Sequence, residues 1–80
     1  MKPQIGDVVT CKVREEAYYS NYGITPECWF EPGDMAVVAS VDVPKIWHRG
    51  TFICADFEKD GRKWRVGLDP KNIRIITRLV

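Results

Sequence analysis

Apolar and polar side chains alternate over several short stretches of this chain. Successive side chains of a β-strand point to opposite faces, so such alternation indicates strands with one buried face and one wet face. The first stretch runs from Asp7 to Arg14 and places three residues on the face that we expect to be buried: Val9, Cys11 and Val13. No stretch repeats apolar residues at the i, i+3, i+4 spacing of a helix over two turns, so the pattern predicts a β protein.

Two stretches in the middle of the chain predict further strands. From Met35 to Val43 one face carries a single apolar set: Met35, Val37, Ala39, Val41 and Val43. This strand is long enough to bend round a small barrel. From Thr51 to Phe57 both faces are largely apolar, which is typical of a strand covered on both sides, so we expect it to be central.

Turn residues connect these strands to two more. Asp60-Gly61 is the strongest hairpin signal in the chain, because a type I′ turn needs positive φ angles that Asp and Gly tolerate. It joins the strand ending at Phe57 to a returning strand over Arg62–Leu68. A second turn at residues 69–72, Asp-Pro-Lys-Asn, leads to a last strand with these residues facing inward: Ile73, Ile75 and Leu79.

Five short strands in an 80-residue chain predict one small barrel. A sheet hides its unpaired edges by curling until it closes or nearly closes, and a core this small needs large side chains to fill it. We therefore expect a single domain over residues 1–80, with residues 1–5 as a loose N-terminus. The predicted core or barrel-cap residues are Trp29, Phe30, Phe52, Phe57 and Trp64.

Three pieces of the sequence resemble the Src-homology 3 (SH3) domain, in the same order as in that family. Phe-Glu-Pro-Gly-Asp, which begins at Phe30, is similar to the family's diverging turn. Trp-His-Arg-Gly, which begins at Trp47, resembles the start of its third strand. Gly-Leu-Asp-Pro-Lys-Asn, which begins at Gly67, is similar to its ending, although Ile73 follows where the family has tyrosine. The resemblance implies an all-β, five-stranded SH3-like barrel.

In the SH3 family, tyrosines of a long first loop, a tryptophan and the proline of the last turn form shallow grooves for a proline-rich peptide. Flat aromatic walls receive the preformed polyproline II ligand at little entropic cost, and acidic loop residues pair with a basic residue beside it. The resemblance therefore implies a non-catalytic protein-binding or accessory module. Its contact residues would be Tyr18, Tyr19, Tyr22, Glu15, Glu16, Trp47 and Pro70.

Other small barrels offer alternative functions. The opening Ile-Gly-Asp-Val-Val-Thr-Cys-Lys-Val resembles the start of electron-transport accessory subunits, of the nitrile hydratase β chain and of a ribosomal barrel family. An accessory subunit or inhibitor docked on a larger enzyme therefore stays open. So does a nucleic-acid-binding barrel, because more than half of the basic residues lie from Lys59 onward, opposed only by Asp60 and Asp69. That interface would use Lys45, Arg49, Arg62, Lys63, Arg65, Lys71 and Arg74.

Composition and cysteine spacing favour a soluble cytoplasmic protein without a cofactor. Apolar residues make up 45% of the chain and the net charge is +1, which is ordinary for a globular domain and steers it to no charged surface. The start of the chain lacks the apolar core of a signal peptide.

Cys11, Cys28 and Cys54 lack the close spacing of a zinc site, so we expect free, mostly buried thiols. No catalytic motif surrounds His48, so we expect no enzyme.

Overall fold

The protein is built from β-strands joined by turns. The computed structural model describes residues 2–19, 28–45 and 49–77. Within them the strands are β1 (Val8–Cys11), β2 (Glu15–Glu16), β3 (Tyr18–Tyr19), β4 (Trp29–Phe30), β5 (Ala36–Pro44), β6 (Thr51–Lys59), β7 (Arg62–Leu68) and β8 (Ile73–Thr77). One 3-10 turn, η1 (Pro70–Asn72), precedes β8, and the described residues contain no α-helix. The predicted all-β class is confirmed.

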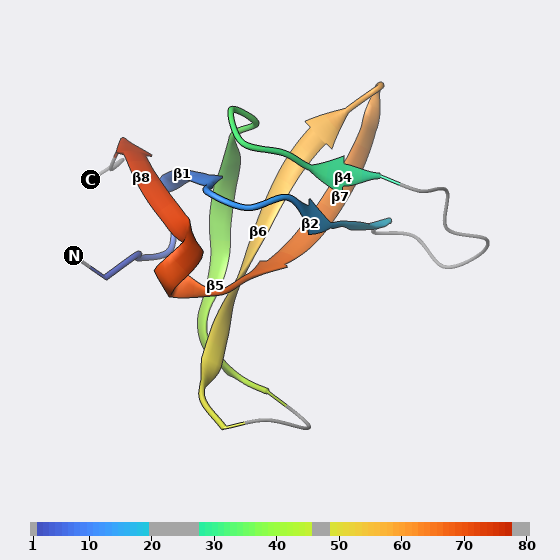
Figure 1. The fold of residues 1–80 in the computed structure, drawn as a ribbon. Coiled ribbons are helices and arrows are strands. Elements are labelled where there is room, and N and C mark those ends of the chain that lie inside the picture. The colour runs from blue at the N-terminus through green and yellow to red at the C-terminus, as the bar shows by residue number, and fades with distance from the viewer. Residues whose placement is uncertain (1, 20–27, 46–48, 78–80) are drawn as a thin grey trace.

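An antiparallel sheet in the order β3-β7-β6-β5-β1-β8 forms most of the domain (Figure 1). Its five longer strands correspond to the five that the sequence pattern predicts, and the two-residue β3 extends one edge. β2 and β4 form a second, two-stranded sheet, called the β2–β4 ribbon below. Closure into a barrel is not seen in the described part of the chain, where β3 and β8 are the two ends of the larger sheet.

The β6–β7 hairpin has the geometry that its sequence predicts. Asp60 and Gly61 both have positive φ angles, 55° and 72°, as a type I′ turn requires. The strands pair without a break, beginning with Lys59 opposite Arg62. β6 lies between β5 and β7, so its prediction as a central strand is confirmed.

The turn between β7 and β8 also lies where the sequence predicts it. Oδ1 of Asp69 accepts a hydrogen bond from the Lys71 N–H at 2.9 Å, and this bond is the main cause of a lowered pKa of Asp69. Pro70 lies in the first turn of η1. A backbone N–H at this position has no acceptor within the helical turn, so the missing N–H of proline breaks no hydrogen bond. The Asn72 N–H then donates to the Asp69 carbonyl oxygen at 2.9 Å. Local side-chain chemistry is therefore enough to end β7 and start β8.

β5 changes the face that it buries part-way along its length. Val38 points into the core, whereas Met35 and Val37 are exposed. Beyond Val38 the β5–β6 register shifts, and Asp42 in that interval has a φ of 54°. After the shift Val41 packs against the core. The prediction that Met35, Val37 and Val41 share one face was therefore wrong, because a bulge displaces the alternation of a strand by one residue.

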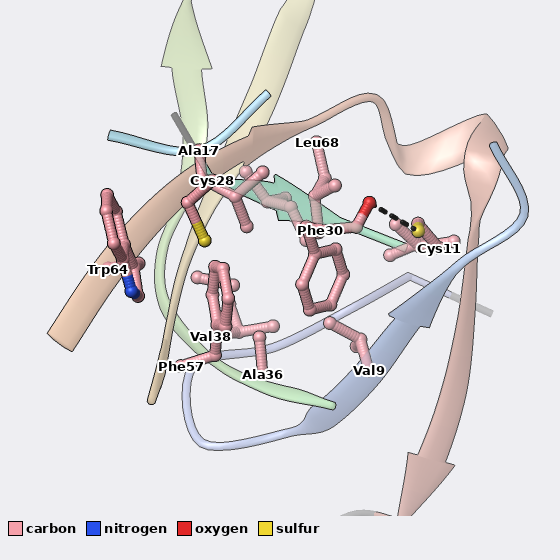
Figure 2. Close-up of a cluster of buried hydrophobic side chains, with 14 residues drawn as sticks. Val9, Cys11, Ala17, Cys28, Phe30, Ala36, Val38, Phe57, Trp64 and Leu68 are labelled. Carbon is pink, nitrogen blue, oxygen red and sulfur yellow. Dashed lines mark hydrogen bonds between the residues drawn. The ribbon is translucent and has the colours of Figure 1, made fainter. Parts of the chain in front are cut away.

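The core lies between the larger sheet and the β2–β4 ribbon (Figure 2). The fully buried Phe30 ring lies 4.8 Å from the Phe57 ring, and burial of one such ring contributes about 2 to 3 kcal/mol. Ile73 and Ile75 face inward as predicted, whereas Leu79 lies outside the described residues. The buried cluster comprises Val9, Cys11, Ala17, Cys28, Phe30, Ala36, Val38, Ile53, Ala55, Phe57, Trp64, Val66, Leu68 and Ile73.

The predicted core residues are confirmed in part. Three of the five aromatic residues are buried: Phe30, Phe57 and Trp64. Trp29 and Phe52 are only half-buried, and the Phe52 ring covers Gly67 on the neighbouring strand, where a β-carbon would meet it at 3.2 Å. Val13 is 53% exposed rather than buried, because β1 ends at Cys11 and the chain bends there. The predicted strand from residue 7 to 14 is therefore too long at both ends.

Two turns with the same pair of hydrogen bonds precede β1 and β5. The Asp7 N–H donates to the Gln4 carbonyl oxygen at 3.0 Å, and Oδ2 of Asp7 accepts from the Gln4 N–H at 2.8 Å. Asp34 repeats both bonds with Glu31, at 2.9 and 3.0 Å. The glycine before each aspartate has a positive φ angle, 94° and 102°. Because β1 and β5 pair with each other, the same Gly-Asp turn positions both members of one strand pair.

Candidate functional site

An open groove of about 470 Å³ lies beside the β6–β7 hairpin. Six of its lining residues form the surface that we call the groove face: Met35, Val37, Asp56, Glu58, Lys63 and Arg65. Phe57 and Trp64, which belong to the core, also line it. The groove therefore combines an apolar lining with charges of both signs.

Strand register assembles the groove face. Val37 pairs with Asp56 across β5 and β6, and Asp56 pairs with Arg65 across β6 and β7. Directly paired residues place their side chains on the same side of a sheet, so these three form one row. Glu58 pairs with Lys63 in the next row. The groove face consequently has an apolar column beside β6, an acidic column on β6 and a basic column on β7.

Met35 and Val37 make up the apolar column. Met35 is 60% exposed and Val37 is 43% exposed. A single exposed apolar residue is ordinary on a protein surface, but two that line one hollow form a patch. An apolar surface laid on this patch would release the water that covers both side chains. The column can therefore supply binding free energy.

Asp56 and Arg65 form a two-point ion pair in the groove face. Nε of Arg65 lies 2.8 Å from Oδ1 of Asp56, and Nη2 lies 3.2 Å from Oδ2. Hydrogen bonding to Asp56 raises the pKa of Arg65. Both side chains are about half exposed, so the pair contributes at most about 1 kcal/mol to stability. Its clearer effect is to hold two opposite charges at defined positions on the surface.

A lysine clamp fixes the position of the turn that leads into the groove face. Nζ of Lys59 donates to the Trp29 carbonyl oxygen at 3.0 Å and to Oδ2 of Asp34 at 3.1 Å. The hydrogen bond to Asp34 raises the pKa of Lys59. Burial acts to raise the pKa of Asp34, but hydrogen bonds from the Glu31 N–H and from Lys59 outweigh burial and lower it. Because Met35 directly follows Asp34, the clamp also positions the apolar column.

The three cysteines are free thiols, as predicted. Cys11 and Cys28 are buried, and burial raises the pKa of both. Cys54 is half-buried on β6, and burial raises its pKa although Arg65 acts in the opposite direction. Raised pKa values keep thiols protonated and unreactive at neutral pH. Among residues 2–19, 28–45 and 49–77, no group of His, Cys, Asp and Glu side chains could hold a metal ion.

The predicted acidic and tyrosine contacts lie on β2 and β3. Glu15 and Glu16 belong to the β2–β4 ribbon, where Glu15 is half-buried and Glu16 is exposed. The backbone of Tyr18 pairs with Arg65, at the border of the groove face, and Tyr19 is the next residue of β3. The structure therefore brings the start of the tyrosine-rich segment to the edge of the groove face.

The other members of the predicted binding rim lie elsewhere. Pro70 is exposed in η1 and lines a second, smaller cavity of about 140 Å³. It follows Arg65 by five residues, which corresponds to roughly 15 Å of extended chain. Tyr18 pairs with Arg65 within β7, whereas Pro70 lies beyond the end of β7, in η1. Tyr22 and Trp47 lie outside the described residues.

The basic residues of the nucleic-acid alternative are distributed over several elements. Lys63 and Arg65 belong to the groove face, and Lys45 lies 3.7 Å from Asp69 in an ion pair. Arg74 is on β8, which three strands separate from β7, so it lies on the order of 20 Å from Arg65 along the sheet. The remaining three are exposed: Arg49, Arg62 and Lys71. The described basic residues thus lie in at least two separate places.

Four residues of the groove face were not predicted from the sequence: Met35, Val37, Asp56 and Glu58. A signal for Met35 and Val37 is present in Met-Ala-Val-Val, residues 35–38, where both alternating sets are apolar. That pattern is also typical of a strand covered on both faces. Only the packing shows that the β2–β4 ribbon and the rest of the core cover one face, while the face with Met35 and Val37 stays open.

Comparisons with known proteins provide no relative for this chain. No protein-family model matches it, and comparison with curated proteins and with solved structures found no significant match. In the described part of the chain, no helix has the length and apolar character needed to cross a membrane.

Proposed function

We propose that the protein is a non-catalytic protein-binding module that contacts its partner through the groove face. The observation that carries this proposal is the exposed pair Met35 and Val37 beside fixed charges of both signs. Apolar contact supplies much of the free energy of association, and the charges set the orientation and reject unsuitable partners. An accessory module docked on a larger protein would use the same surface in the same way.

The proposal includes an SH3-like small barrel as the fold family. Three local features support it. The tight turn Glu31–Asp34 stands directly before β5, as the diverging turn does in the resemblance. η1 separates the last two strands, as does the family's short helical turn. The five longer strands are also neighbours in one antiparallel sheet, in the order β7-β6-β5-β1-β8. Along the chain only β2, β3 and β4 intervene, between β1 and β5.

The tyrosine-rich segment extends the proposed contact surface. β3 lies next to β7 at one edge of the larger sheet, and Tyr18 pairs with Arg65 of the groove face. A partner that covers the basic column therefore lies against the strand at which this segment begins. Contacts at Trp47 and Pro70 remain a separate prediction, because Pro70 lines a different cavity.

A photoreactive amino acid placed at Met35 tests the proposal in the native cell. We expect irradiation to yield a covalent adduct of higher mass, whose second component is identified by mass spectrometry. The same group placed at Val13, which is 53% exposed and outside the groove lining, is the matched control. Equal adducts from both positions, or none from Met35, would show that the groove face is not the contact surface.

A further inference from the structure

We infer that the groove face binds the same face of a second copy of this chain, in a two-fold symmetric dimer. The inference rests on the proposed function, since it names a partner for the surface proposed there. It is carried by the charge pattern on two neighbouring strands. Asp56 and Glu58 form the acidic column on β6, and Arg65 and Lys63 stand beside them in matched rows on β7.

A surface with this pattern is complementary to itself in one arrangement. In a two-fold dimer both copies contribute the same patch, so each residue must suit the residue that symmetry brings opposite it. Consider a two-fold axis parallel to the strands, midway between β6 and β7. Rotation about this axis leaves every row at the same position along the strands. It places β6 of one copy over β7 of the other, so the acidic column of each copy faces the basic column of the other. Asp56 then comes opposite the second copy's Arg65, and Glu58 opposite the second copy's Lys63.

Other two-fold arrangements of this face are less favourable. An axis parallel to the strands and centred on β6 brings the acidic column opposite itself. An axis perpendicular to the strands also keeps β6 over β6, so acid again faces acid. An axis between β5 and β6 sets Val37 against Asp56. Juxtaposed like charges and charges covered by apolar groups both oppose association, so the pattern selects the axis between β6 and β7.

The same arrangement also covers Val37 of the apolar column. The rotation brings β5 over the second copy's β3, because β3 and β5 flank the β6–β7 pair. Val37 shares a row with the backbone of Tyr18 through Asp56 and Arg65, so Val37 comes opposite that part of the second copy. Sheets that pack face to face lie about 10 Å apart with strands within roughly 30° of each other. An axis nearly parallel to the strands satisfies that geometry.

The ion pair within each chain takes part in the dimer contact. Asp56 and Arg65 already hold each other in position, 2.8 Å apart at their closest atoms. In the dimer, two such pairs face each other with their signs exchanged. Each charge therefore has one opposite charge beside it and one opposite charge across the contact. Preorganised charges lose little side-chain freedom when the contact forms.

Charge exchange at a single row tests the arrangement. The variants are Glu58→Lys and Lys63→Glu, each alone, mixed in equal amounts, and combined in one chain. Sedimentation equilibrium at low ionic strength, from millimolar to micromolar loading, measures self-association. Circular dichroism checks that each variant is folded. The matched control is Lys12→Glu, which makes the same change as Lys63→Glu at an exposed position outside the groove lining.

We expect the parent protein to shift with concentration from 9.2 kDa to twice that mass. Each single variant places like charges opposite each other in its own dimer, so its dimer dissociation constant rises by about tenfold or more. The equimolar mixture and the combined variant restore association, because position 58 of one copy again meets an opposite charge at position 63 of the other. Mixing changes no contact within a chain, so a loss of folding stability cannot account for that restoration.

Three results would overturn the inference. The first is a parent protein that stays monomeric at millimolar concentration. The second is a mixture that associates no better than the single variants, and the third is a loss in the Lys12→Glu control equal to the loss in Lys63→Glu. The proposed function is tested separately, because a Met35-specific adduct with a different protein supports it even if the purified chain is monomeric.

Discussion

Lys59 and Asp34 join two segments that are 25 residues apart in the sequence: Nζ of Lys59 lies 3.1 Å from Oδ2 of Asp34. The same ammonium donates to the Trp29 carbonyl oxygen at 3.0 Å. One side chain at the end of β6 is therefore bonded both to β4 and to the turn before β5. This contact aligns the two charged columns of the groove face with the apolar column that starts at Met35.

Replacement of the clamp lysine should destabilise the protein. Lys59→Met keeps most of the aliphatic stem but removes both hydrogen bonds. Because the side chains of Lys59 and Asp34 are 34% and 33% exposed, we expect a loss of only about 1 kcal/mol in the free energy of unfolding. Urea denaturation measures it. Lys12→Met, at an exposed lysine after β1, is the control, and an equal loss there would contradict the role of the clamp.

Asp34 makes part of this stability depend on pH. Its folded-state pKa is lowered, since the hydrogen bonds from the Glu31 N–H and Lys59 outweigh the effect of burial. Such a carboxylate contributes stability above its ordinary pKa, here 3.8, and loses that contribution as the pH falls through the lowered value. We expect Asp34→Asn to be less stable than the parent at neutral pH, with the difference narrowing in acid. Urea denaturation over this range gives the result, and a difference that is independent of pH would contradict it.

Gly61 is required by the backbone of the β6–β7 turn. Its φ is +72°, and a β-carbon built there meets no atom within 4 Å, so a substitution is opposed by conformation rather than by collision. We expect Gly61→Ala to cost about 1 kcal/mol and Gly61→Asn clearly less, because asparagine tolerates the left-handed region. Thermal unfolding followed by circular dichroism compares the two. Equal melting temperatures for the two variants would show that the turn does not hold this conformation.

Phe30 links the β2–β4 ribbon to the larger sheet. It is fully buried against Phe57, so truncation to alanine leaves a cavity in the centre of a small core. We expect Phe30→Ala to cost about 4 kcal/mol, which is a large part of the total stability of a domain of this size. Phe52→Ala, at a half-buried ring on the other face of β6, is the comparison and should cost less. Urea denaturation gives the free energy of unfolding of both variants, and a loss for Phe52→Ala as large as that for Phe30→Ala would contradict the prediction.

Local sequence signals predicted the elements whose conformation depends on neighbouring residues. Asp60-Gly61 and residues 69–72 form the expected turns because their backbone preferences and side-chain hydrogen bonds act within a few positions. The five longer strands follow from period-two alternation, since a strand's pattern records which face is covered. The boundaries were less accurate: Val13 fits the alternation but lies beyond the end of β1.

Alternation and turn residues alone were thus enough to predict an all-β chain, its principal hairpin, the turn before β8 and most of the buried aromatic positions. Only packing sets which face of β5 is covered, because the core lies against Ala36 and Val38 and leaves Met35 and Val37 exposed. Beyond Val38 a register shift then moves the alternation of the strand, so that Val41 packs against the core. Tertiary structure also decided that Asp56, Glu58, Lys63 and Arg65 stand in matched rows, since pairing between strands sets which side chains become neighbours. Apolar patterning indicates that a residue can be buried. Whether it is buried depends on what packs against it.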